Sequence, residues 1–185
     1  MKKLYRFLSS ISDFLQKPAE FISAIILFTG AMSLFLQVIN RYILVKIFDF
    51  SFTFTEELSR YTIIWFTYII AGVCLKEGEL VSLNLLYSKL SKIPKLILYF
   101  FTRALMLLFV VVIIKYIAVY LPTAMKFRSV AMGIPGAFLY SFPGIGCVLL
   151  GYEIITEVCG VASGELQPFC EGRKPYTDGS DIDMI

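Results

Sequence analysis

Long apolar stretches, separated by short charged ones, dominate the sequence. The hydrocarbon core of a bilayer is about 30 Å thick, so a helix that crosses it needs roughly twenty apolar residues. The stretches that reach this length are 21–44, 54–75, 96–121 and 135–158. The pattern predicts an all-α integral membrane protein, in which these four transmembrane helices form one domain over residues 21–160.

Two further segments have the pattern of amphipathic helices at the membrane surface. Residues 1–20 place apolar side chains at helical spacing among basic ones, which predicts a cytoplasmic helix lying on the membrane. Between the second and third spans, Leu83, Leu86, Tyr87 and Leu90 follow the i, i+3, i+4, i+7 pattern of a short interfacial helix. Residues 161–185 are polar and are expected to form a cytoplasmic tail.

The loop charges predict the orientation. The N-terminal segment and the connection between the second and third spans are the most basic parts of the chain. Their cations are Lys2, Lys3, Arg6, Lys17, Lys76, Lys89, Lys92 and Lys95. Cytoplasmic loops carry the excess of Lys and Arg, so we expect both termini and this connection inside the cell.

Composition excludes several classes of protein. Hydrophobic residues make up 58% of the chain and mean hydropathy is +0.77, so no soluble nucleotide-binding domain fits beside the spans. The absence of histidine excludes a bis-histidine haem site. The 4 cysteines form no C-x-x-C pair, which disfavours a membrane disulfide-exchange enzyme. We therefore expect no catalytic residue, no metal or cofactor in this chain, and no nucleic acid partner.

Charged residues gather where the first two spans meet the outer surface. Helical spacing brings Glu56 and Glu57 within reach of Arg60, and a short connection places Arg41 at the same level. These four charges are expected either to form a buried network or to bind water and lipid headgroups. Trp65 lies too deep for an interfacial belt, so we expect it to pack against another helix.

A second group of charges is expected at the inner end of the bundle. Arg103 in the third span lies at the level of Glu153 and Glu157 in the fourth. A charged side chain inside the membrane needs a partner, so we expect Arg103 to pair with one of these two carboxylates.

These residues, taken in order, resemble the DctQ-like small membrane subunit of the tripartite ATP-independent periplasmic (TRAP) transporters. The resemblance covers residues 21–158. It rests on Val38 to Tyr42, on Glu56-Glu57-Leu58-Ser59-Arg60 with Trp65, and on Ala131 to Pro135. The sequence departs from the family where Phe54 stands in place of a tryptophan and Leu80 in place of a histidine.

The resemblance implies a non-catalytic permease subunit in a bacterial inner membrane. It would brace a large membrane subunit, contact lipids, and help to dock a periplasmic substrate-binding protein. Sodium-coupled uptake of an organic acid, with sialic acid and dicarboxylates among the candidates, would be carried out by the large subunit. The candidate docking residues in the outer connections are Lys46, Asp49, Lys126 and Arg128. Lys126 and Arg128 could equally bind lipid phosphates or water.

Two other functions are consistent with four spans. A stand-alone structural membrane protein is one of them. A small exporter is the other, but it would need an essential carboxylate deep in its first span, and Glu20 lies at the inner edge.

Overall fold

The described residues form long helices joined by short connections. A computed structural model of the chain describes residues 2–44, 46, 53–78 and 92–166. Its elements are α1 (Lys2–Ile39), the π-helical turn η1 (Asn40–Leu44), α3 (Phe54–Glu77), α5 (Lys92–Ala124) and α6 (Gly136–Ala162). Four of them are long and apolar enough to cross a membrane, which confirms the predicted fold class. The predicted interfacial helix and most of the tail lie outside the described residues.

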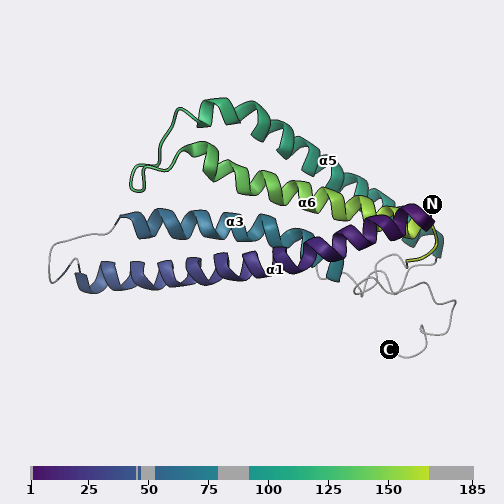
Figure 1. The fold of residues 1–185 in the computed structure, drawn as a ribbon, viewed down its shortest axis with the longest axis horizontal. Helices are drawn as coiled ribbons and strands as arrows, with labels where there is room; N and C mark the ends of the chain where they lie inside the picture. The colour runs from purple at the N-terminus through teal and green to yellow at the C-terminus, as the bar shows by residue number, and fades with distance from the viewer. Residues whose placement is uncertain (1, 45, 47–52, 79–91, 167–185) are drawn as a thin grey trace.

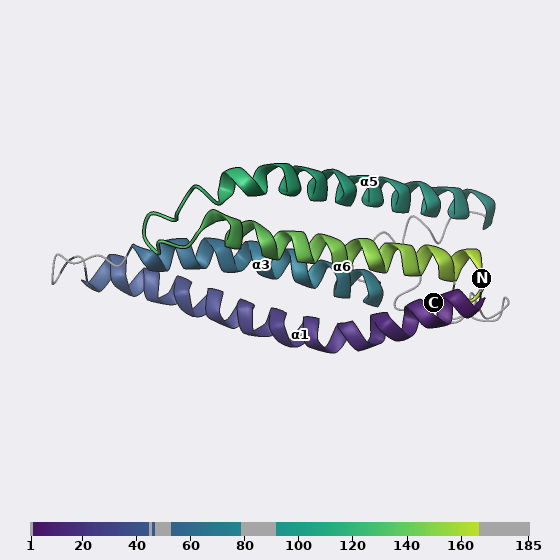
Figure 2. The ribbon, with the colours of Figure 1, turned by 45° about the horizontal axis from the view of Figure 1, so that its top comes forward.

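The helices lie side by side in a row rather than in a closed ring. α3 and α6 are in the middle, α1 packs on the far side of α3, and α5 packs on α6 (Figure 1). The turned view shows the same order, with α5 at one edge and α1 at the other (Figure 2). The connection between α5 and α6 lies at the end of the bundle remote from the N-terminus. The edge helices therefore leave much of their surface uncovered.

The N-terminal segment differs from the expectation of a separate surface helix. It is the first part of α1, which runs through Pro18 without interruption and bends in this part of its length (Figure 2). Tyr5 and Ser12 are buried, whereas the apolar Phe7 and Phe14 are exposed. The cause is tertiary, because this segment packs along the C-terminal part of α6.

Small residues allow the middle helices to approach closely. Membrane helices associate through packing and hydrogen bonds, since lipid is as apolar as their side chains. A Cβ atom added to Gly146 of α6 would lie 2.5 Å from the carbonyl oxygen of Tyr68 in α3. A Cβ atom on Gly30 of α1 would lie 2.7 Å from the hydroxyl oxygen of Thr62. Backbone and side chains at these two crossings leave no room for a methyl group.

The surface of the bundle is apolar along most of its length. Large side chains such as Phe28, Phe35 and Phe101 are more than half exposed. Only 6% of the most apolar stretch of α5 is buried, compared with 39% in both α3 and α6. α5 therefore presents its surface to lipid or to another protein.

The crossing at Gly146 provides a direct test of the packing. We expect Gly146→Ala to destabilise the protein by about 1–3 kcal/mol, because the new methyl group would overlap the Tyr68 backbone. The matched control is Gly144→Ala, where the new Cβ atom would lie 3.8 Å from Ile117. Thermal unfolding in mild detergent measures both, and equal melting temperatures for the two variants would contradict the close approach.

Candidate functional site

Glu57 ties α3 to the connection between α5 and α6 at the end of the bundle remote from the N-terminus. We call this the outer end, because the loop charges predict that it faces outward, and the opposite end the inner end. Its carboxylate accepts a hydrogen bond from the Ser129 hydroxyl. The same oxygen lies 3.2 Å from the backbone N–H of Ala131 and 3.3 Å from that of Met132. Hydrogen bonds to a charged acceptor are stronger than neutral ones, so one side chain fixes this connection to a neighbouring helix.

The connection itself is a compact hairpin. The N–H of Ser129 donates to the Ile134 carbonyl at 2.9 Å, and the N–H of Gly133 donates to the Ser129 carbonyl at 3.0 Å. Gly133 has a φ of 66°, which glycine adopts without steric cost. Lys126 and Arg128 are exposed on this hairpin. Glu57 therefore holds the hairpin that carries these two cations at this end of the bundle.

The sequence left two arrangements open for the four charges at this end, and the described residues do not form the buried network. Arg60 pairs with Glu56 at 3.0 Å, and both side chains are more than half exposed. Glu57 points toward Ser129, because neighbouring residues on a helix project about 100° apart. Arg41 is exposed, and within the described ranges no carboxylate lies within ion-pair distance of it. An exposed pair such as Glu56 with Arg60 is worth roughly 0–1 kcal/mol.

Trp65 joins α3 to α6 in the outer half of the bundle. Its indole N–H donates to the Leu139 carbonyl at 3.2 Å. Its ring stacks on Phe142 with centroids 4.4 Å apart and meets the Phe138 ring edge-on at 5.5 Å. Trp65 therefore packs against another helix, as the sequence analysis expected.

Arg103 and Glu157 form the most buried ion pair among the described residues. A guanidinium nitrogen lies 2.7 Å from a Glu157 oxygen, and the two side chains are 3% and 17% exposed. The guanidinium carbon of Arg103 lies over the Tyr99 ring, 5.2 Å from the ring centroid. Of the two partners that the sequence left open, Glu157 is the one that pairs with Arg103.

Glu153 makes a different contact. It accepts a hydrogen bond from the Ser12 hydroxyl of α1 at 2.6 Å, and it is 8% exposed. Nearby, the Tyr152 hydroxyl donates to the Leu8 carbonyl at 2.7 Å. α6 therefore holds the N-terminal part of α1 with two polar contacts that the sequence analysis did not identify.

A third inner contact connects α1 with α3. Lys76 pairs with Asp13 at 2.6 Å, and the Lys76 side chain is 9% exposed. The amide of Gln16, one turn along α1, donates to Glu20 and lies 3.3 Å from an oxygen of Glu77. Several charged side chains near both ends of the spans thus pair within this chain, chiefly at the inner end.

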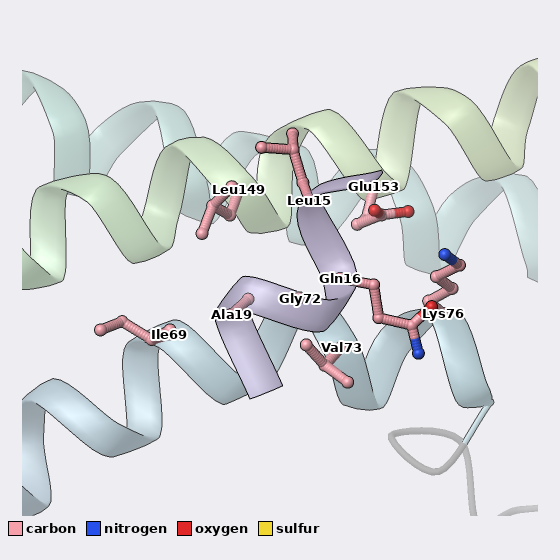
Figure 3. A pocket seen from close by; sticks show the side chains of 9 residues that line it. All are labelled: Leu15, Gln16, Ala19, Ile69, Gly72, Val73, Lys76, Leu149 and Glu153. Atoms are coloured by element: carbon pink, nitrogen blue, oxygen red, sulfur yellow. The ribbon is translucent and has the colours of Figure 1, made fainter. Parts of the chain in front are cut away.

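A small cavity lies where α1, α3 and α6 meet. Its volume is about 20 Å³, enough for one water molecule. Gln16, Lys76 and Glu153 form its polar side, and apolar side chains such as Ile69 and Leu149 lie opposite (Figure 3). The two charged side chains that line the cavity already have partners, Lys76 in Asp13 and Glu153 in Ser12. The cavity therefore has the character of a packing site and not of a reaction site.

The described residues contain no arrangement suited to catalysis on a metal. Within them, no group of three or more His, Cys, Asp or Glu side chains is placed to hold an ion. Among the described residues, Cys74, Cys147 and Cys159 form no disulfide. The charged side chains at both ends instead serve to position helices and one outer hairpin.

Comparison with known proteins relates the chain to one family of transporters. A family model described as "Tripartite ATP-independent periplasmic transporters, DctQ component" matches residues 30–164. A protein of Haemophilus influenzae, described as a TRAP transporter small permease protein, is 28% identical over 149 residues. That alignment covers 80% of this chain and 90% of the relative.

The role of Glu57 can be measured in the hairpin that it holds. Glu57→Ala removes the acceptor for Ala131 and Met132, and hydrogen bonds to a charged group are worth about 1.5–3 kcal/mol. We expect amide hydrogen exchange at these two residues to rise roughly 10-fold to 100-fold. Glu56→Ala is the control, and an equal rise in that variant would show that Glu57 is not the anchor.

A double-mutant cycle tests the inner pair. Removing one charge leaves the other buried and unpaired, so Arg103→Met or Glu157→Gln alone is expected to cost about 3–5 kcal/mol. Arg103→Met combined with Glu157→Gln should cost clearly less than the sum of the two single changes. Unfolding in detergent gives the three values, and simple additivity would mean that the two residues do not depend on each other.

Proposed function

The chain belongs to the DctQ component family of tripartite ATP-independent periplasmic transporters, and from this premise we propose that it braces the large membrane subunit of such a transporter. It is a transport component and not an enzyme. The observation that supports a bracing role is that α6 is tied to both of its neighbours and to α1. Arg103 with Glu157 ties α5, Ser12 with Glu153 ties α1, and Trp65 ties α3.

A brace must keep its shape while its partner moves. Contacts between buried charges have one good geometry, and the close approach at Gly146 prevents α3 and α6 from sliding past each other. In this proposal the large subunit carries the substrate and the sodium ions, and this chain holds its stationary part. The substrate is an organic acid, with sialic acid and dicarboxylates as candidates.

We further propose that the hairpin carrying Lys126 and Arg128 takes part in docking the periplasmic substrate-binding protein. The positive-inside rule places this end of the bundle outside an inner membrane with both termini in the cytoplasm. Lys126 and Arg128 are exposed there on a hairpin that Glu57 holds still. Lys46 is also exposed, and Asp49 lies outside the described residues.

A charge-reversal experiment tests docking. In proteoliposomes with both membrane subunits, Lys126→Glu combined with Arg128→Glu should lower uptake about tenfold at limiting binding protein, because rim charges act mainly on the association rate. Wild-type uptake should also fall as salt screens these charges. The measurement is initial uptake of labelled substrate.

The controls separate docking from bracing. The doubly reversed variant should still co-purify with the large subunit, and its uptake should recover at saturating binding protein. Unchanged uptake at limiting binding protein would remove the two cations from the docking surface. Failure of the wild-type chain to co-purify with a large membrane subunit would instead contradict the bracing role.

A further inference from the structure

The outward face of α5 has a regular pattern that its own bundle does not use. Side chains spaced alternately four and three residues apart form one seam along the helix, which we call the α5 seam: Phe101, Leu105, Leu108, Val112, Lys115 and Val119. All of them are exposed. Val110, which packs on α6, projects from the opposite side at 100° per residue. Spacing of this kind is what one helix presents to another in a coiled-coil contact.

Lys115 lies on this seam at the middle depth of the bundle. Ile117 lies beside Gly144 and Val110 beside Gly151, which places Lys115 at the level of Gly146. Gly146 in turn touches Tyr68 of α3.

Tyr68 marks the centre of the span. It lies about two helical turns, roughly 12 Å, from Arg60 on one side and from Lys76 on the other. Arg60 belongs to the outer layer of charges and Lys76 to the inner one. The backbone of Lys115 is therefore roughly 12 Å from both layers of charge, far from either end of the span.

Lys115 differs from the charged groups near the inner end of the spans. Arg103, Glu157 and Lys76 each pair within the bundle, whereas no carboxylate of the described residues lies within ion-pair distance of Lys115. A cation that faces hydrocarbon at this depth is costly, and such residues normally face protein.

We propose that the α5 seam packs against a membrane helix of the large subunit, and that this helix presents a carboxylate to Lys115 at mid-membrane depth. The proposal rests on the bracing function above and adds the surface and the chemistry of its partner. A second copy of this chain is a poorer occupant, because a two-fold contact along the seam would bring two Lys115 side chains near each other. Lipid is poorer still, because it offers no counter-charge at that depth.

Photocrosslinking identifies what covers the seam. A benzophenone amino acid is placed at Leu108 on the seam or at Phe28, an exposed position on α1, and the two membrane subunits are expressed together. We expect a crosslink to the large subunit from Leu108 that is absent or much weaker from Phe28. A crosslink between two copies of this chain from Leu108, or one to the large subunit from Phe28 alone, would overturn the proposal.

Substitutions of Lys115 test the charge. Lys115→Leu should lower the co-purified large subunit at least about tenfold, and Lys115→Arg should retain most of it. The melting temperature of the isolated small subunit should not fall in Lys115→Leu, which shows that the chain itself still folds. Unchanged co-purification in Lys115→Leu would mean that Lys115 faces lipid and would overturn the pairing. A wild-type chain that never co-purifies with a large subunit would instead contradict the proposed function.

Discussion

The two inner carboxylates of α6 are the constraint on which the rest of the bundle depends. Glu153 and Glu157 lie one turn apart, and each binds a different neighbour: Ser12 of α1 and Arg103 of α5. α1 and α5 are the edge helices of the row, and neither is enclosed by a closed core. Their positions therefore depend on a few polar contacts to α6 in addition to apolar packing.

Such contacts contribute more to geometry than to net stability. A buried ion pair gains little over apolar residues of the same shape, yet it tolerates no misplacement of either partner. The guanidinium of Arg103 has one carboxylate within 2.7 Å and the Tyr99 ring beneath it, so α5 has one favourable register against α6. Gly146 likewise fixes the register of α6 against α3, because it lies directly against the Tyr68 backbone. A fixed register is what a brace requires.

The sequence predicts the helices well because span length is a local property. It predicts pairing less well because partners are distant in the chain. The i, i+4 pair of Glu56 and Arg60 follows from spacing alone, whereas Glu57 binds Ser129, which lies 72 positions away in the chain. Polar residues of a turn give no sign of which helix they will meet. For this reason spacing alone left two arrangements open for the four charges, and among them the described residues form the Glu56–Arg60 pair.

The sequence does contain a pattern that indicates a first helix continuing through Pro18. The basic, amphipathic composition of residues 1–20 makes this pattern hard to recognise. The residues that face the bundle along α1 and η1 recur every seven positions: Tyr5, Ser12, Ala19, Ile26, Ser33 and Asn40. A seven-residue repeat indicates one helix packed along another, and this repeat crosses Pro18 in register. Most of its members are small or polar, so a search for an apolar stripe selects the exposed side, where Phe7 and Phe14 lie.

α5, the other edge helix, has the same seven-residue spacing, but its repeat differs from that of α1 in side-chain size and in exposure. On α1 the repeat is made of small and polar side chains, and it is covered by α3 and α6. On α5 the repeat is made of large apolar side chains and one lysine, and it is uncovered. Small residues permit close contact within one subunit, whereas large residues at this spacing provide an extensive surface for a separate helix. The difference in side-chain size thus distinguishes the face that folds the chain from the face that we propose joins it to its partner.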